Sequence, residues 1–229
     1  MKIQRCSLFV AALAAGVTVP HALAYIPAGD LYLYPQGGAV RTGLLSEDGL
    51  TTTPDVRVFF AELGEDVPNF AEEPGWQSPD GTFPGAGTLT FTIGGAVRRW
   101  DGVDFFTRVG FMSLAFGPLG PIVSPASDSP VVGFALPIDA SGGLHDHPDY
   151  ELLAPASDGV YLLPLGFSTD YPGLAPSSPV WFLFAQNADA ASSQAAYDWA
   201  AANIPAPMTI AWLAAPCLLT RRHRRAAIG

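Results

Sequence analysis

The chain has 229 residues, and only 14% of them are Asp, Glu, Lys or Arg, against about 25% in an average soluble domain. Its 24 glycines and 22 prolines exclude a coiled coil, a long helical bundle and a highly charged disordered chain. The formal charge of −10 excludes a nucleic-acid-binding protein that relies on phosphate contacts, because such proteins carry a basic face.

The charges are distributed unevenly along the chain. Two of the eleven cations lie in the first five residues and four in the last nine, whereas all 21 carboxylates lie between Asp30 and Asp198. The segment between the ends therefore has five arginines, no lysine and a formal charge of −16. The sequence divides into residues 1–24, 25–204 and 205–229.

Residues 1–24 have the pattern of a secretory signal peptide. Two cations precede an apolar run at residues 8–17, which is shorter than the roughly 20 residues of a membrane-spanning helix. Ala22 and Ala24 are small residues of the kind that signal peptidase accepts, so we expect cleavage before Tyr25. The alternative interpretation is a buried N-terminal helix.

Residues 205–229 combine a proline step, an apolar stretch and a cluster of arginines. The proline step is Pro205-Ala206-Pro207, and the apolar stretch covers residues 209–220. Because cytoplasmic arginines resist translocation, we expect the apolar stretch to stop in the membrane as a transmembrane helix. The arginines that follow it are Arg221, Arg222, Arg224 and Arg225.

This tail resembles the PEP-CTERM sorting signal, which a membrane transpeptidase, exosortase, recognises in Gram-negative bacteria that produce exopolysaccharide. Ala206 stands where the family usually has Glu, and Pro216 interrupts the apolar stretch. The resemblance implies exosortase as a partner, an inner-membrane intermediate, and delivery to the cell envelope, the cell surface or the exterior. The alternative is a plain C-terminal membrane anchor.

The segment between the two signals contains short apolar runs typical of strands. In residues 88–93, Leu89, Phe91 and Ile93 alternate with threonines, which places the apolar side chains on one face. Asp-Gly pairs and prolines separate such runs and favour turns. We therefore predict an all-β domain, an antiparallel, jelly-roll-like β-sandwich. Strands are expected at residues 31–34, 56–60, 88–93, 111–116, 131–136, 160–163 and 180–184.

One C-terminal helix is expected at residues 190–203. Asp189 can cap its N-terminus, and Pro205 ends it. Its many alanines favour the helical conformation. Tyr197 and Trp199 are its large side chains, so we expect this helix to pack on the sheet just before the membrane segment.

The segment between the signals also resembles, as a whole, uncharacterised exported proteins of planctomycete-like bacteria that carry the same sorting tail. The resemblance implies no known activity. It rests on Asn69-Phe70, Gly81-Thr82-Phe83-Pro84, Trp100-Asp101-Gly102, His145-Asp146-His147, Asp158-Gly159-Val160-Tyr161 and Asn187-Ala188-Asp189.

A candidate metal site lies in residues 145–151. On a strand, His145, His147, Asp149 and Glu151 would share one face, because alternate side chains point the same way. Imidazoles with carboxylates can bind zinc, copper or iron. The alternative is a polar strand face exposed to water, and Pro148 indicates an edge strand or a bulge.

The His-x-His pair followed by a glutamate also resembles the first metal motif of cupins. That resemblance implies a metal-dependent enzyme that uses His145 and His147. Cupins carry a further histidine on a downstream Pro-x-Gly strand, whereas here Pro164-Leu165-Gly166 is followed by residues 167–169 without histidine. The ligand set of a cupin is therefore incomplete in this chain.

An acidic stretch at residues 62–73 is a weaker candidate for calcium. It lacks the Asp-x-Asp-x-Asp-Gly spacing of a dedicated calcium loop, and a solvated loop is the alternative. The sequence has no Gly-x-Ser-x-Gly elbow and no Walker-type loop. The acidic residues of this stretch are Glu62, Glu65, Asp66, Glu72 and Glu73.

The first functional hypothesis is a non-catalytic structural or matrix-binding protein of the cell envelope. It follows from two targeting signals around a β-rich domain without a recognisable catalytic motif. Signal peptidase, exosortase, the membrane and an extracellular polysaccharide are the expected partners, with no nucleic acid and no obligatory cofactor. The alternatives are a cupin-like metal-dependent enzyme centred on His145 and His147, and a calcium-assisted glycan-binding module.

Overall fold

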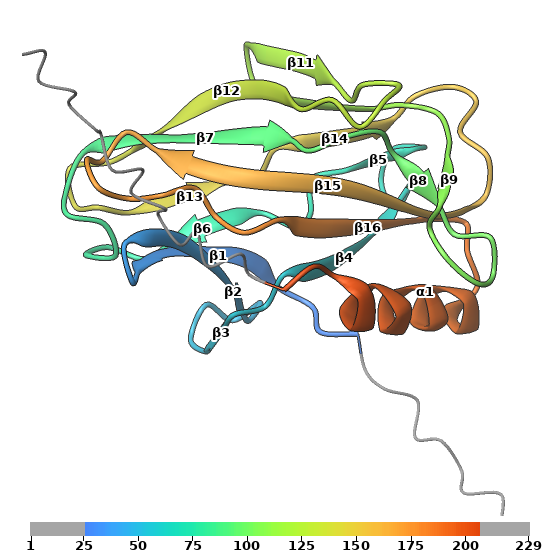
Figure 1. Ribbon diagram of the computed structural model, residues 1–229, viewed down its shortest axis with the longest axis horizontal. Coiled ribbons are helices and arrows are strands. Elements are labelled where there is room, and N and C mark those ends of the chain that lie inside the picture. Colours follow the sequence, from blue (N-terminus) through green and yellow to red (C-terminus); the bar gives the residue numbers. More distant parts are fainter. Residues whose placement is uncertain (1–25, 207–229) are drawn as a thin grey trace, which may run out of the picture.

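The structure, a computed structural model, describes residues 26–206. Within this range the chain forms strands β1 to β16 and one helix, α1 (Figure 1). The prediction of a β-rich fold with one C-terminal helix is therefore confirmed. The predicted signal peptide with Ala22, Ala24 and Tyr25, and the predicted membrane segment with Pro207 and the four terminal arginines, lie outside the described residues.

The first of three sheets has the strand order β13-β6-β1-β2-β3. Strands β1 and β2 form an antiparallel hairpin across the two glycines of residues 37–38, which both have positive φ. Asp30 and His145 lie on this sheet, in β1 and β13. Its strands are β1 (Asp30–Gln36), β2 (Ala39–Leu45), β3 (Thr52–Pro54), β6 (Trp76–Ser78) and β13 (Leu144–Asp146).

The other two sheets have the orders β11-β10-β14-β5 and β12-β7-β15-β16-β4. The short hairpin of β8 (Arg98–Arg99) and β9 (Thr107–Arg108) joins the larger sheet through β15. The remaining strands are β4 (Val58–Leu63), β5 (Phe70–Ala71), β7 (Gly87–Ile93), β10 (Met112–Phe116), β11 (Leu119–Val123), β12 (Val131–Ile138), β14 (Asp149–Leu152), β15 (Gly159–Thr169) and β16 (Val180–Gln186).

All seven runs that the sequence predicts as strands overlap strands of the structure. In β7 the side chains of Leu89, Phe91 and Ile93 are fully buried, and the intervening threonines are half-buried. This is the burial pattern expected from strict alternation of apolar and polar residues.

The sheets are mixed rather than purely antiparallel. Strand β1 runs parallel to β6, and β4 runs parallel to β16. Parallel neighbours need a long connection between them, and here Val58 pairs with Trp181, far along the chain. The expectation of an antiparallel arrangement throughout is therefore corrected, because apolar alternation specifies the buried face of a strand but not its neighbour.

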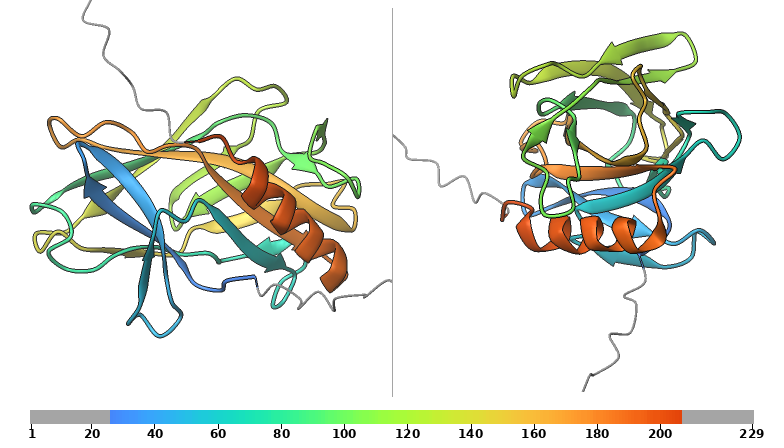
Figure 2. Two further views of the ribbon diagram at one scale, coloured as in Figure 1. Left: turned by 60° about the horizontal axis from the view of Figure 1, so that its bottom comes forward. Right: turned by 90° about the vertical axis from the view of Figure 1, so that its right-hand side faces the viewer.

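One continuous apolar core connects the three sheets. It includes Leu31 of the first sheet, Met112 of the second and Phe182 of the third, each fully buried. At its centre the Trp76 ring makes edge-to-face contacts with Phe91 and Phe167, at centroid distances of 5.3 and 5.0 Å. Burying large aromatic side chains stabilises the fold, and the strands enclose this core when viewed from the end (Figure 2).

Helix α1 (Ala190–Asn203) packs outside the largest sheet, beside β4 and β16 (Figures 1 and 2). The Asp189 carboxylate accepts a hydrogen bond from the Ser192 N–H at 2.8 Å, which confirms the predicted N-cap. The Trp199 ring stacks on Trp181, with the ring centroids 6.1 Å apart. Within residues 26–206, no helix has the length and apolar character needed to cross a membrane.

Candidate metal site in an acidic groove

The predicted run from His145 to Glu151 is not one strand. The chain leaves β13 at Asp146 and enters β14 at Asp149, and the break contains Pro148. Strand β13 pairs with β6 in the first sheet, whereas β14 pairs with β10 and β5 in the second. The expectation of a single strand is therefore corrected, and its physical reason is that proline cannot donate to a strand ladder.

The two histidines nevertheless face each other. The Nε2 atoms of His145 and His147 are 3.0 Å apart. Two imidazole nitrogens bound to one tetrahedral zinc ion at about 2.0–2.1 Å would be about 3.3 Å apart. The observed spacing is close to that value, and it is also the spacing of a hydrogen bond between the two rings.

Asp30, at the start of β1, supplies a carboxylate to the same place. One carboxylate oxygen of Asp30 and one nitrogen from each histidine all lie within 4.8 Å of one another. The Oδ1 atom of Asp30 accepts a hydrogen bond from the Gly75 N–H at 3.0 Å, which orients the carboxylate. A set of two imidazoles and one carboxylate is a common ligand set for zinc and for non-haem iron.

The Nδ1 atom of each histidine contacts a polar side chain. The Nδ1 atom of His147 lies 3.2 Å from Oε1 of Glu73, and the Nδ1 atom of His145 lies 3.3 Å from the side-chain amide of Gln77. The Glu73 carboxylate accepts a hydrogen bond from Nδ1 of His147 and so leaves Nε2 of that ring free to coordinate. The Gln77 amide nitrogen donates to Nδ1 of His145, and rotating this amide by 180° would present its oxygen and free Nε2 of His145 in the same way. The Nδ1 contacts therefore orient both rings, and the contact with Glu73 leaves Nε2 of His147 free for an ion.

A buried hydrogen-bonded chain supports the backbone below the site. The Trp76 indole N–H donates to the Tyr150 hydroxyl at 2.8 Å, and that hydroxyl donates to the Pro74 carbonyl at 3.1 Å. Full burial raises the pKa of Tyr150 well above its usual value, so this hydroxyl keeps its proton at neutral pH. The backbone beside Gly75 is thus anchored to the core.

Asp149 and Glu151 do not join this cluster. They lie on the outer face of β14, whereas the alternate residues Tyr150 and Leu152 are buried on the opposite face. The Glu151 carboxylate accepts a long hydrogen bond of 3.5 Å from the Ser113 hydroxyl of β10. Of the four predicted ligands, the structure brings together His145 and His147 and adds Asp30 in place of the two carboxylates.

The cluster opens into a groove of about 890 Å³. The predicted acidic stretch forms much of its wall, and the groove lining contains eight carboxylates and two histidines but no lysine or arginine. Such a surface attracts cations and repels anions. The carboxylates are Asp30, Glu47, Asp48, Glu62, Glu65, Asp66, Glu72 and Glu73.

Two of the carboxyl groups around the histidines have a raised pKa. Partial burial raises the pKa of Glu73, and the nearby Asp30 raises it further, while the Gly75 N–H and His147 lower it. Partial burial also raises the pKa of Asp146, against the effect of the two imidazoles. A bound cation would offset the cost of keeping such groups ionised together.

A comparison with protein-family models and with curated proteins found no match. The geometry of this site is therefore the basis for a functional proposal. Sequence reasoning missed Asp30, Gly75 and Gln77, because they lie far from the histidines in the chain and no local motif marks them. The N-terminal part of the predicted sorting motif is described, and its Pro205 carbonyl accepts a hydrogen bond of 2.5 Å from Arg57.

Proposed function

We propose that this chain is an exported protein of the cell envelope whose β domain binds a divalent transition-metal ion through Asp30, His145 and His147. One observation carries the metal-binding proposal. The two Nε2 atoms lie 3.0 Å apart while a side chain holds each Nδ1 atom from behind. The Glu73 carboxylate behind His147 and the Asp30 carboxylate beside both rings favour a metal site over a polar face exposed to water.

The chemistry of the ligands favours a borderline metal such as zinc, iron or copper over calcium. Calcium takes oxygen ligands, whereas two of these three ligands are imidazole nitrogens. Three protein ligands also leave coordination positions open. In this site the open positions would face the groove, so an ion bound there remains accessible to small molecules.

The export part of the proposal rests on the sequence. The secretory pattern of residues 1–24, and the resemblance of residues 205–229 to an exosortase sorting signal, support delivery to the envelope through an inner-membrane intermediate. The partners proposed on this basis are signal peptidase, exosortase and the membrane. The protein would then remain at the surface, where an extracellular polysaccharide is the proposed contact.

The fold is proposed to be a jelly-roll-like β-sandwich. An apolar core shared by all three sheets supports this assignment, as does the preponderance of antiparallel strand pairs. Cupins share the His-x-His pattern, but the third candidate ligand here comes from β1 rather than from a downstream strand.

A metal-dependent enzyme is the second candidate function. The groove beside the open coordination positions favours it, because a substrate could reach the ion there. Metal-loaded protein would be assayed on panels of esters, phosphoesters and oxidisable phenols, with the His145→Ala/His147→Ala variant as the control. Turnover that is lost in this variant supports an enzyme, and the absence of turnover on all panels contradicts it.

Metal binding is tested by elemental analysis and calorimetric titration of the purified full chain with Zn²⁺. We expect one ion per chain, and affinity weakened by more than about 100-fold in His145→Ala/His147→Ala and in Asp30→Asn. The matched control is Asp149→Asn/Glu151→Gln, which removes two carboxylates outside the cluster and should bind as the wild type does. Equal binding by the histidine variant and the wild type would overturn the proposal.

A further inference from the structure

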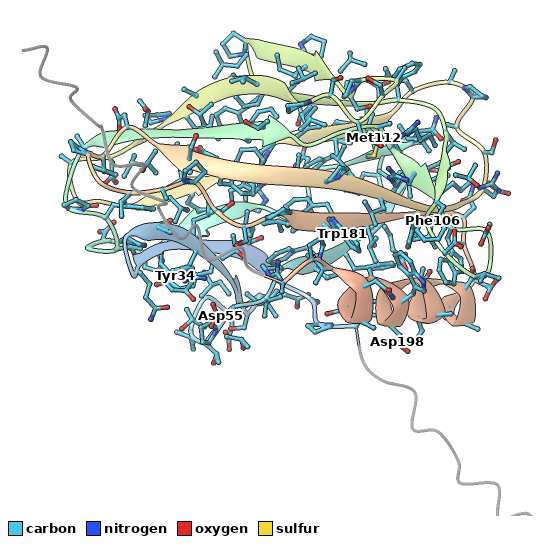
Figure 3. The ribbon with its side chains drawn as sticks, in the orientation of Figure 1. Tyr34, Asp55, Phe106, Met112, Trp181 and Asp198 are labelled. Carbon is cyan, nitrogen blue, oxygen red and sulfur yellow. The ribbon has the colours of Figure 1, made fainter. Side chains whose placement is uncertain are left out.

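A second pocket, of about 430 Å³, lies beside the β1–β2 hairpin. Its polar lining comes from the end of β1, from β2, from the segment between β3 and β4, and from the chain just before β16. Figure 3 shows Asp55 of this lining close to Tyr34, whose hydroxyl accepts a hydrogen bond of 3.3 Å from the Asp55 N–H. The lining residues used below are Gln36, Arg41, Asp55, Arg57 and Ser178.

This pocket contains two of the five arginines of an otherwise strongly acidic domain. The other three have partners: Arg98 and Arg108 bind the Asp128 carboxylate, and Arg99 donates to the Asp158 carbonyl at 2.5 Å. Among the residues that the structure describes, no carboxylate forms an ion pair with Arg41 or Arg57. Arg41, Arg57 and Arg99 are therefore the guanidinium groups of this range without an ion pair, and two of the three line this pocket.

Arg41 has an unmet hydrogen-bonding requirement. Its Nε atom is buried and has no hydrogen-bond partner among the described residues. A buried donor without a partner costs free energy, so a native structure that retains one calls for an explanation. The Nε atom of Arg99 is in the same state, but Arg41 also lines a pocket that a hydrogen-bond acceptor could enter.

Arg57 is already fixed in position. Its NH1 group donates to the Pro205 carbonyl at 2.5 Å and to the Pro179 carbonyl at 3.5 Å. Neutral carbonyls fix the guanidinium without cancelling its charge. Little side-chain entropy would then be lost when this charge meets a ligand, which favours binding.

The charge of the pocket indicates the charge of its ligand. Two arginines and Asp55 give the lining a net charge of +1. A guanidinium matches the planar geometry of a carboxylate, and a singly charged carboxylate would neutralise this pocket, whereas a doubly charged phosphate would meet repulsion from Asp55. The side chains of Gln36 and Ser178 offer hydrogen bonds to hydroxyl groups.

We propose that this pocket binds a sugar acid, with the carboxylate of a uronic acid held between Arg41 and Arg57. The volume suits a ligand of one or two sugar rings. The site is independent of the candidate metal site, which is lined by different residues. Its chemistry would give a protein at the cell surface a direct contact with acidic polysaccharide.

The test is calorimetric titration of the full chain with glucuronate and galacturonate, with glucose as the neutral control. We expect binding of at least one uronate but not of glucose. Arg41→Gln and Arg57→Gln should each weaken the affinity about tenfold or more. The matched control is Arg108→Gln, which removes the same charge outside the pocket and should leave the affinity unchanged.

A variant that is expected to bind uronate more tightly provides a test that misfolding cannot imitate. Asp55→Asn removes the negative charge of the pocket and should tighten uronate binding by about threefold or more. Asparagine also tolerates the positive φ of 61° at this position. Three results would overturn the proposal: no uronate binding at about 10 mM, equal binding by Arg41→Gln and the wild type, or binding of inorganic phosphate in preference to the uronates.

Discussion

Gly75 lets the ligands of the candidate metal site approach the backbone closely. A Cβ atom at this position would lie 2.7 Å from Cε1 of the His147 ring and 2.9 Å from Oδ1 of Asp30. Such distances are shorter than van der Waals contact, so even a methyl group would displace both ligands. The same residue donates its N–H to Asp30 and, at 2.8 Å, to Oε2 of Glu73.

Gly75→Ala should therefore weaken Zn²⁺ binding about 10- to 100-fold, the range seen when groups that orient metal ligands are lost. The affinity is measured by calorimetric titration, and folding is checked by circular dichroism. Gly166→Ala is the matched control, because a Cβ atom there would meet no atom within 4 Å. Unchanged affinity in Gly75→Ala would contradict the proposed position of the ion.

Among the individual residues of the site, the sequence predicted the histidine pair but not the residues around it. The spacing of His145 and His147 is local, and it is visible without any knowledge of the fold. Asp30 and Gly75 reach the histidines because β1 pairs with β6 and β6 pairs with β13. Those pairings depend on which strands become neighbours, and a pattern within one strand carries no such information.

Among the elements, the β8–β9 hairpin is tied to the loop before β12 by one carboxylate. Asp128 accepts hydrogen bonds from Arg98 at 3.0 Å and from Arg108. The hydrogen bond from Arg108 holds the pKa of Asp128 below its usual value, and the charge of Arg98 contributes to the same shift. Both arginines lie in the hairpin, one on each strand.

This lowered pKa makes the contribution of Asp128 to stability depend on pH. A carboxyl group with a lower pKa in the folded state stabilises the protein above its unfolded pKa and loses that effect as the pH falls through the folded value. Asp128→Asn should therefore lower the melting temperature slightly at pH 7. The difference from the wild type should vanish at strongly acidic pH, and a difference that persists there would contradict the charge-based explanation.

The elements themselves were largely predictable where burial alternates cleanly. Helix α1 occupies the predicted residues 190–203, because a capping aspartate, a run of alanines and a following proline are all local signals. Strand β2 was missed because Arg41, Thr42 and Gly43 interrupt its apolar pattern. It forms nevertheless, because its partner β1 supplies a full antiparallel ladder.

For the whole molecule, the dominant electrostatic feature is self-repulsion. The described range contains 21 carboxylates and five arginines, and eight of the carboxylates line a single groove. Like charges at such density destabilise the compact state. Dissolved salt screens them, since the Debye length falls from about 30 Å at 0.01 M to about 8 Å at 0.15 M ionic strength.

The metal-free protein should therefore become more stable as salt is added. We expect the melting temperature to rise between about 0.01 M and about 0.15 M sodium chloride, as measured by differential scanning calorimetry in the presence of a chelator. Choline chloride should act in the same way if screening is the cause. A rise with sodium alone would indicate a specific ion site, and a fall with both salts would contradict the prediction.

The parallel pairing of β4 with β16 also constrains the order in which the protein can fold. The paired residues Val58 and Trp181 are about 120 positions apart, and contacts of such long range slow folding. Since a ribosome makes the chain from its N-terminus, the largest sheet stays open until β16 has been synthesised. Strand β4 thus remains without its parallel partner during most of translation, and this delay would suit the proposed passage through a secretory channel before the domain closes.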